Sequence, residues 1–276
     1  MLVDGSNLLF QMFYGMPARI IGRQGKPIQG TLGFVGALLK MVRKLQPTHL
    51  AVLFDGETQN PRGELDGSYK SNREDYSLLP EEDTPFSQLP DVYAALDYLG
   101  ICHRETECCE TDDWMASYAL GLGREYRMTL MSQDSDYFQL ITDKVCVLRY
   151  RGDNSVVCDC AYIREKLGIE PCQYADFKCL TGDSSDNIRG ADKVGPKTAA
   201  ALMGQFGSLQ SLLDNVQEIS KPSIRASIQA NRDRLLLNQK LIRLEAKYPV
   251  PFSMEEMAFT YDGQTSTKVL TAIGVK

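Results

Sequence analysis

Acidic residues follow three of the short apolar runs in this chain. The acids that stand just after these runs are Asp4, Asp55, Asp134 and Asp136. Short runs rich in branched apolar residues, such as residues 50–54 and 128–132, are typical of buried parallel strands. The crevice beyond the carboxyl ends of such strands is the usual ligand site of an open α/β sheet. Carboxylates that converge there repel one another unless cations neutralise them, and oxygen ligands favour Mg²⁺ or Mn²⁺.

A further acidic group precedes a helical stretch at residues 112–122. It consists of Glu110, Asp112 and Asp113. Each acid also has an ordinary structural explanation, since carboxylates stabilise helix N-termini and Asp55 could begin a turn. These explanations give no reason for acids at three separate strand ends. We therefore interpret the acids together as a divalent-metal site.

The composition is that of an ordinary globular protein of 276 residues with a formal net charge of −6. No apolar run approaches the roughly 20 residues that cross a bilayer, and Asp4 interrupts the first apolar stretch, which argues against a signal peptide. We expect a cytoplasmic monomer with no membrane partner. The eight cysteines include no CxxC pair, so reduced thiols are favoured over zinc sites or disulfides. The two histidines lack the spacing of a zinc helix.

The order of predicted elements indicates an α/β domain. Apolar residues recur at helical spacing in residues 7–16, 31–45, 92–100 and 112–122. These helices alternate with strands, and that order implies a mostly parallel twisted sheet flanked by helices. A late hairpin or edge pair is expected at residues 145–149 and 156–157.

The character of the chain changes twice. Residues 57–91 are polar and hold four prolines, which is typical of a functional flap or else of disorder. This segment carries Arg62, Lys70 and Arg73, so it could bring cations toward the acids. The last part of the chain has a helical pattern throughout. The expected domains are an α/β domain at residues 1–158 and an all-helical domain at residues 159–276.

A basic stretch lies in the expected helical domain. Between Ile219 and Val250 there are seven basic residues and two acids. Such a surface suits phosphates even though the chain as a whole is acidic. A solvated helix face is the alternative, and charge alone favours that alternative.

Residues 194–197 read Val-Gly-Pro-Lys and open a predicted helix that runs to about Phe206. Proline suits the first helical turn, and glycine lets a backbone approach a ligand. The exposed amides of such a helix start attract phosphate oxygens, and Lys193 and Lys197 add positive charge. Contacts of this kind bind nucleic acid without reading its sequence. On its own, the segment is equally well explained as an ordinary Gly-Pro helix start.

Six short motifs occur in an order that resembles the bacterial and phage 5′ nuclease family. These are the flap endonuclease relatives that include the 5′→3′ exonuclease domain of DNA polymerase I. The motifs are Asp4–Asn7, Phe54–Gly56, Tyr69–Arg73, Glu110–Asp113, Asp134–Leu140 and residues 182–199. Each is weak alone, but together they cover nearly the whole chain. The resemblance implies a PIN-like α/β sheet, an arch within residues 57–91, and a C-terminal helix-three-turn-helix subdomain that grips duplex DNA.

The resemblance also implies a metal-dependent nuclease that hydrolyses DNA near free 5′ ends, flaps or junctions. One divalent ion would be held by Asp4, Asp55, Glu110 and Asp112. The second would be held or positioned by Asp113, Asp134, Asp136, Asp183 and Asp186. Two such ions about 4 Å apart stabilise the attacking and leaving oxygens of an in-line cleavage. Arg62 and Lys70 would stabilise charge on the scissile phosphate.

The DNA contacts that the resemblance implies lie around this acidic site. Phe10 falls where relatives carry a tyrosine that stacks on a base, and phenylalanine keeps the π-face. Tyr69, Lys70 and Arg73 belong to the arch segment that threads or clamps a 5′ strand. Relatives bind a K⁺ ion in the helix-three-turn-helix. The residues of that element that would hold the duplex are Lys193, Gly195, Lys197 and Thr198.

Some features depart from the family pattern. The start at Met1 shortens the first strand, and no polymerase-like sequence follows, so we expect a free-standing nuclease or an excised domain. Arg189 and Asp192 alter the turn before the predicted helix. Two other functions stay open: a PIN-type ribonuclease, which would not need the motif at residues 182–199, and a non-catalytic DNA-binding protein. A non-catalytic DNA-binding protein would be expected to have lost some acids of the second metal group, whereas Asp134, Asp136, Asp183 and Asp186 are all present.

Overall fold

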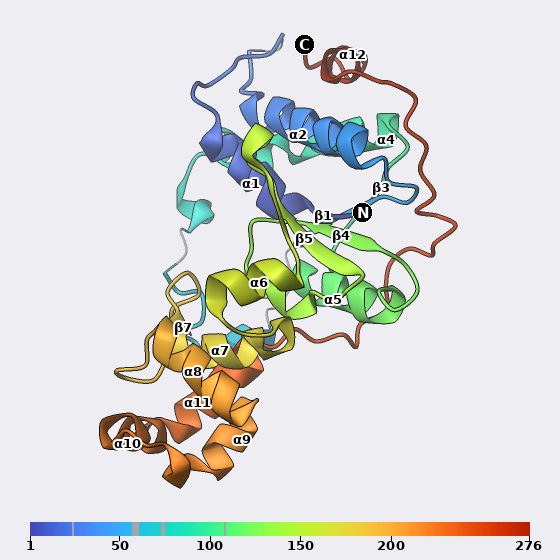
Figure 1. Ribbon diagram of the computed structural model, residues 1–276. Helices are drawn as coiled ribbons and strands as arrows, with labels where there is room; N and C mark the ends of the chain where they lie inside the picture. Colours follow the sequence, from blue (N-terminus) through green and yellow to red (C-terminus); the bar gives the residue numbers. More distant parts are fainter. Residues whose placement is uncertain (24, 57–60, 73–74, 108) are drawn as a thin grey trace.

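The computed structural model describes residues 1–23, 25–56, 61–72, 75–107 and 109–276. Among these residues the central sheet has six strands in the order β3-β2-β1-β4-β5-β6 (Figure 1). Strands β1 to β5 are parallel, whereas β6 pairs antiparallel with β5. The expected α/β fold is confirmed. The strands are β1 Leu2–Asp4, β2 Ala51–Phe54, β3 Cys102–Glu105, β4 Met128–Met131, β5 Val145–Arg149 and β6 Val156–Cys158.

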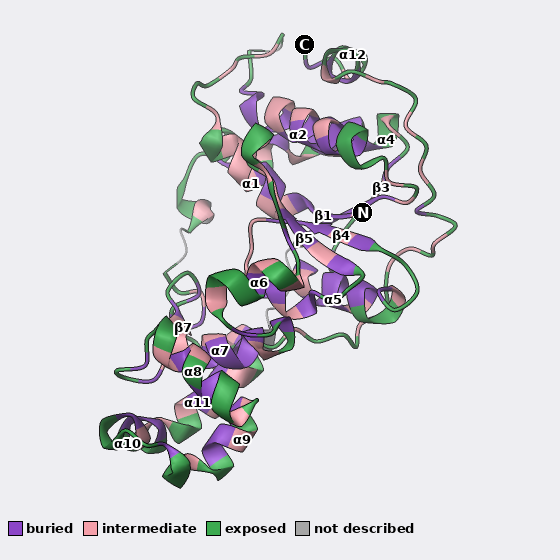
Figure 2. Cartoon of the chain, in the orientation of Figure 1, coloured by how far each residue is buried: buried purple, intermediate pink, exposed green. Residues whose placement is uncertain are grey.

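Helices cover both faces of the sheet. The helices of the described residues are α1 Gly5–Gly15, α2 Gln29–Leu45, α3 Pro61–Leu65, α4 Leu89–Tyr98, α5 Thr111–Leu122, α6 Cys160–Leu167, α7 Tyr174–Thr181, α8 Pro196–Phe206, α9 Leu209–Asp214, α10 Pro222–Ala230, α11 Arg232–Ile242 and α12 Ser266–Ala272. Of these, α8 to α11 lie in the C-terminal part, away from the sheet (Figure 1). Val3 and Val52 pack with α1, α2 and α4, whereas Leu2 and Ala51 pack with α5. This alternation follows from the two-residue period of a strand. Figure 2 shows buried residues concentrated where the helices meet the sheet.

Three strands were not predicted from the sequence. Two of them, β7 Gly182–Asp183 and β8 Ile188–Arg189, form a short antiparallel pair in the part that was expected to be all-helical, and the third is β3. β3 pairs in parallel with β2 at the edge of the sheet, and His103, Arg104 and Glu105 in it are half-buried or exposed. A polar edge strand lacks the apolar run that marks buried strands. The hairpin expected at residues 145–149 and 156–157 is present as β5 and β6.

The polar segment at residues 57–91 contains short helical turns in its described part. After α3 come 3₁₀ turns at Tyr76–Leu78, Glu81–Asp83 and Pro85–Gln88. The backbone N–H of Lys70 donates to Asp186 O at 3.0 Å. Asn72 Nδ2 donates to Ser184 O at 2.9 Å. This segment therefore lies against the loop that follows α7.

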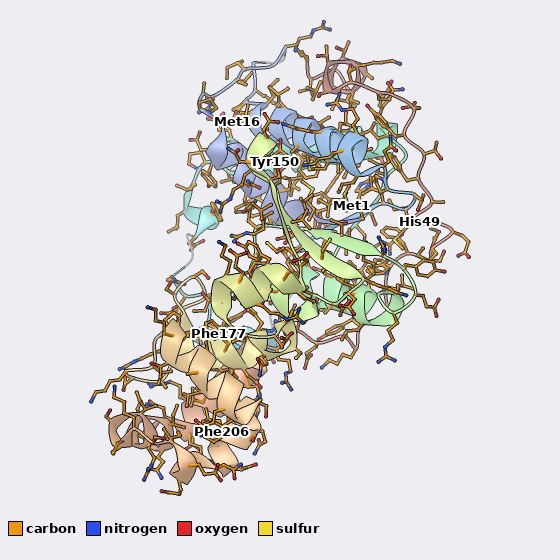
Figure 3. All side chains as sticks on the ribbon, in the orientation of Figure 1. Met1, Met16, His49, Tyr150, Phe177 and Phe206 are labelled. Carbon is orange, nitrogen blue, oxygen red and sulfur yellow. The ribbon has the colours of Figure 1, made fainter. Side chains whose placement is uncertain are left out.

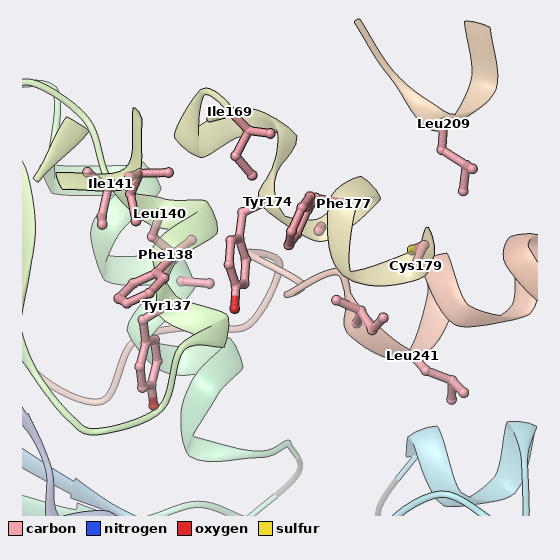
Figure 4. Close-up of a cluster of buried hydrophobic side chains, with 14 of the residues drawn as sticks. Tyr137, Phe138, Leu140, Ile141, Ile169, Tyr174, Phe177, Cys179, Leu209 and Leu241 are labelled. Atoms are coloured by element: carbon pink, nitrogen blue, oxygen red, sulfur yellow. The ribbon is translucent and has the colours of Figure 1, made fainter. Parts of the chain in front are cut away.

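The C-terminal helices pack beneath the sheet without a break in the core. One hydrophobic cluster extends from Leu130 of β4 through Phe138 and Tyr174 to Leu209 and Leu241. The last four of these residues are labelled in Figure 4. In Figure 3 the labels Phe177 and Phe206 mark α7 and α8 on this side of the molecule. Because the core is continuous, the loop between α7 and α8 has a defined position relative to the strand ends.

The chain returns to the sheet after α11, along the right side of Figure 1. The N–H of Leu50 donates to Met257 O at 2.9 Å, and the N–H of Phe259 donates to Thr48 O at 2.8 Å. α12 then packs against α2 and α4 through Val269 and Leu270. Within the part of the chain that the structure describes, no helix combines the length and apolar character needed to cross a membrane.

Candidate metal centre

Asp4 ends β1 beside β4, at the point where the strand order of the sheet reverses. Its carboxylate accepts hydrogen bonds from Asn7 N at 2.9 Å, Ser132 Oγ at 3.0 Å and Tyr137 Oη at 3.1 Å. The bond from Asn7 also caps α1, so helix capping and a place in the site coexist in one residue. Burial, together with the charge of Asp55, raises the pKa of Asp4 to about 7. Ligands bind open α/β sheets at such a switch point.

Asp112 and Asp134 lie in the same region. Tyr137 Oη donates to Asp112 Oδ1 at 2.7 Å. The N–H of Asp134 donates to Ser132 Oγ at 3.0 Å, which links Asp134 to the partner of Asp4. Burial and the nearby charge of Asp134 raise the pKa of Asp112 well above its ordinary value. These raised pKa values are the signature of carboxylates that are buried near one another.

A second group of acids joins the sheet to the helical part. Asp136, Asp183 and Asp186 each offer a carboxylate oxygen, and these oxygens lie within 4.8 Å of one another. Asp136 Oδ1 is buried without a hydrogen bond from any residue that the structure describes, and Lys178 Nζ lies 3.9 Å from it. Burial and the charge of Asp134 raise the pKa of Asp136 to about 8. Three carboxylates with an unsatisfied oxygen fit a hard divalent cation.

Arg62 and Lys70 reach the acids from the segment before α4. Both pair with Glu110, Lys70 at 2.5 Å, and Arg62 also pairs with Asp113 at 2.6 Å. Burial alone would raise the pKa of Glu110, but these two cations hold that pKa below its usual range. Asp113 Oδ1 also accepts a hydrogen bond from the N–H of Glu245 at 2.8 Å. The Asp113 carboxylate therefore faces Arg62 and the chain beyond α11.

Lys178 on α7 is a site residue that sequence reasoning missed. Its ammonium group pairs with Asp183 and lies near Asp136. Burial opposes ionisation of Asp183, yet the bonds from Lys178 and Ser185 hold the pKa of Asp183 below its ordinary value. A lysine on a helix carries no motif, so the only signal was its separation of five residues from Asp183.

Asp55 lies at the exposed rim of the site. Its carboxylate accepts a hydrogen bond from Thr111 N at 3.0 Å, and its own N–H donates to Ser6 Oγ at 2.8 Å. These bonds join the end of β2 to the starts of α1 and α5. Asp55 is thereby held beside the turn that carries Glu110.

The loop after α7 is tied to the segment that carries Lys70. Asn187 has φ +57°, a conformation that asparagine adopts more readily than most residues. Its Nδ2 donates to Ser68 O at 2.9 Å and to Ser71 Oγ at 3.1 Å. The helical part therefore helps to place Lys70 over the acids.

The predicted DNA-binding residues occupy different environments. Lys193, Gly195 and Lys197 are exposed at the start of α8, where Gly195 is the N-cap, and Thr198 beside them is half-buried. Because Gly195 has no side chain, the first amides of α8 have no side-chain cap from the N-cap residue. Such a helix start can accept an anion.

The other predicted contacts lie nearer the sheet. Phe10 packs edge-on against Tyr76 and Phe86, with ring centroids 5.4 and 5.5 Å apart. Tyr69 is buried, and Lys70 Nζ lies 4.8 Å from its ring centroid. Arg73 lies outside the described residues.

Two family models together match most of the chain. Residues 1–168 match the 5′-3′ exonuclease, N-terminal resolvase-like domain, and residues 169–264 match the 5′-3′ exonuclease, C-terminal SAM fold. The chain belongs to the 5′-3′ exonuclease family. The resemblance inferred from its six motifs is thereby confirmed.

Curated relatives of this exonuclease family member are larger polymerases. DNA polymerase I, thermostable, from Thermus aquaticus is 35% identical over 251 residues, which are 91% of this chain and 29% of the relative. DNA polymerase I from Rhizobium leguminosarum is 34% identical over 281 residues, which cover 98% of this chain and 26% of the relative. This chain therefore spans less than a third of the length of these relatives.

Solved structures of similar exonucleases share the fold. The T5 D15 protein co-crystallised with metal ions has a TM-score of 0.71 and 25% identity, with 88% of each chain covered. A bacteriophage T5 D15 flap endonuclease variant in complex with DNA and metal ions has a TM-score of 0.70 and 25% identity, also with 88% of each chain covered. The expected architecture of a 5′ nuclease, a parallel sheet with a helical C-terminal part, is confirmed.

Proposed function

We propose that this 5′-3′ exonuclease family member hydrolyses phosphodiester bonds of DNA at free 5′ ends, 5′ flaps or junctions, and that it requires divalent cations. The observation that carries this proposal is the approach of Asp136, Asp183 and Asp186 within 4.8 Å. Buried like charges at this separation call for a cation. The T5 flap endonuclease complex with DNA and metal ions supports the proposal.

We assign two Mg²⁺ or Mn²⁺ ions to the carboxylates. The first falls to Asp4, Asp55, Glu110 and Asp112, and the second falls to Asp134, Asp136, Asp183 and Asp186. Bound divalent ions supply Lewis-acid activation of water and neutralise charge on a phosphodiester. The Asp113 carboxylate accepts bonds from Arg62 and Glu245 N, so we assign it to holding Arg62 in place beside Glu110.

Three basic side chains offset part of the negative charge of the acids. Arg62 and Lys70 pair with Glu110, and Lys178 pairs with Asp183. A substrate phosphate that enters the site brings negative charge beside these groups. Side chains already held near the acids can stabilise the charge that develops on the phosphate without large rearrangement. Tyr69, buried against Lys70, supports that lysine.

The DNA would be held at two further places. Lys193, Lys197 and the amides that follow Gly195 bind backbone phosphates of the duplex, with Thr198 beside them and K⁺ in the adjoining turn. Phe10 and its aromatic neighbours offer π-faces to an unpaired base on the 5′ side. The enzyme acts as a monomer on DNA in the cytoplasm.

The test incubates 5′-labelled flap DNA and an RNA of the same sequence with the protein in Mg²⁺ or in EDTA. Short labelled products from DNA in Mg²⁺ alone are expected. Products from RNA alone would favour a PIN-type ribonuclease. Tight binding of DNA that stays intact in Mg²⁺ would favour a non-catalytic DNA-binding protein.

A further inference from the structure

The hydroxyl of Tyr137 lies between two carboxylates that come from different elements. It is 2.7 Å from Asp112 Oδ1, in the first turn of α5, and 3.1 Å from Asp4 Oδ2, at the end of β1. Tyr137 itself stands in a 3₁₀ turn that begins at Asp136. One phenol oxygen therefore contacts acids of the strand end and of the helix start at once.

The ring of Tyr137 cannot easily move. It is 0% exposed and belongs to the core cluster beneath the sheet. Figure 4 shows Tyr137 beside Phe138 at the margin of this cluster, with its hydroxyl directed away from the other labelled side chains. Close packing holds such a side chain in one rotamer, so the position of the hydroxyl is set by the core.

The carboxylate of Asp4 has little freedom as a result. Its Oδ1 accepts the N–H of Asn7, and its Oδ2 accepts Ser132 Oγ in addition to the Tyr137 contact. A phenol carries one proton, which the two carboxylate oxygens share, with the shorter contact to Asp112 as the stronger hydrogen bond and the longer one to Asp4 as the weaker. The carboxylates of Asp4 and Asp112 are thus both held by the Tyr137 hydroxyl.

We propose that Tyr137 is a positioning residue that holds Asp4 and Asp112 in the orientation needed to bind a divalent cation. The inference rests on the metal site of the proposed function. Groups that hydrogen-bond metal-ligating carboxylates orient the ligands, and losing one lowers metal affinity by roughly 10- to 100-fold. The 5′ nuclease motif Asp134–Leu140 gave no hint of this role, because it depends on where the ring is buried.

The test compares Tyr137→Phe with Tyr118→Phe. Both remove one buried hydroxyl and keep the ring, but the hydrogen bonds of Tyr118 Oη among the described residues go to backbone atoms of Phe252. Mn²⁺ binding is measured by titration calorimetry without DNA, and the Mn²⁺ concentration for half-maximal cleavage is measured separately. Thermal unfolding in EDTA checks that each variant is folded.

Tyr137→Phe is expected to weaken Mn²⁺ binding by about 10-fold and to raise the half-maximal Mn²⁺ concentration by a similar factor, with a much smaller change in the maximal rate. Tyr118→Phe should leave both Mn²⁺ values unchanged. Equal Mn²⁺ affinity in wild type and Tyr137→Phe would overturn the positioning role, even if Tyr137→Phe were less stable. Absence of Mn²⁺ binding by the wild type would instead contradict the proposed function.

Discussion

At the scale of single residues, Asp134 links the two groups of acids. Its Oδ1 accepts the N–H of Asp136 at 2.8 Å, and its own N–H donates to Ser132, the partner of Asp4. Burial, with the charge of Asp186 as a further contribution, raises the pKa of Asp134. The proposed role of Asp134 in metal binding accounts for a buried carboxylate whose pKa stays raised despite the bond from Asp136.

Asp134→Asn should therefore reduce DNA cleavage by about 100-fold or more, because a charged oxygen ligand is lost. The amide oxygen can still accept the N–H of Asp136, so the fold should persist. DNA binding should be unchanged or tighter, since one negative charge is gone. Single-turnover cleavage and equilibrium binding check the two parts. Asp153→Asn, an exposed acid paired with Lys40, is the control. A wild-type cleavage rate in Asp134→Asn would remove Asp134 from the site.

At the scale of elements, the start of α8 was predictable and its surroundings were not. The Gly-Pro sequence placed the first helical residue at Pro196, because proline suits a first turn. The loop before α8 is built by contacts across the chain, such as Asn187 with Ser68. This contact pairs residues 119 positions apart, and no local pattern marks it.

Lys197→Ala should weaken DNA binding a few-fold and lower the slope of log affinity against log salt by about one unit, because one phosphate contact is lost. Binding measured at several salt concentrations gives the slope. Lys268→Ala, an exposed lysine on α12, should leave the slope unchanged. If Lys197→Ala also kept the wild-type slope, Lys197 would not contact phosphate.

At the scale of the whole molecule, the C-terminal residues return from the helical part and pack against the α/β part. After α11 the chain crosses back to the residues that lead into β2, and α12 buries Val269 and Leu270 against Val35, Leu39 and Ala95. The helical part is thus joined to the α/β part through the shared core, through this return and through the contacts of the loop after α7 with residues 68–72. These connections contribute to stability, and the shared core includes Tyr137, whose hydroxyl contacts Asp4 and Asp112.

Leu270→Ala should lower the free energy of unfolding by about 2–4 kcal/mol, because it leaves a cavity between α12 and the helices it covers. Cleavage at 25 °C should change little. Denaturant unfolding, with the exposed residue Thr267 changed to Ala as the control, measures the loss. An unfolding free energy equal to that of the wild type would mean that α12 is not part of the cooperative structure.

The sequence by itself determined the class of the fold and the acids of the candidate site. Apolar periodicity and strand-end carboxylates are local patterns, so these patterns alone were enough to place Asp4, Asp134 and Asp136 at the carboxyl edge of a parallel sheet. The order of the six motifs added the family. The polar edge strand β3 was missed because its residues bury little apolar surface.

Only the tertiary structure decided how the acids are held. Lys178 beside Asp183, Arg62 on Asp113 and the hydroxyl of Tyr137 between Asp4 and Asp112 all depend on packing between elements. The physical reason is range: periodicity and capping act within a few residues, whereas charge pairing and rotamer choice in a core depend on neighbours that the folded chain brings together.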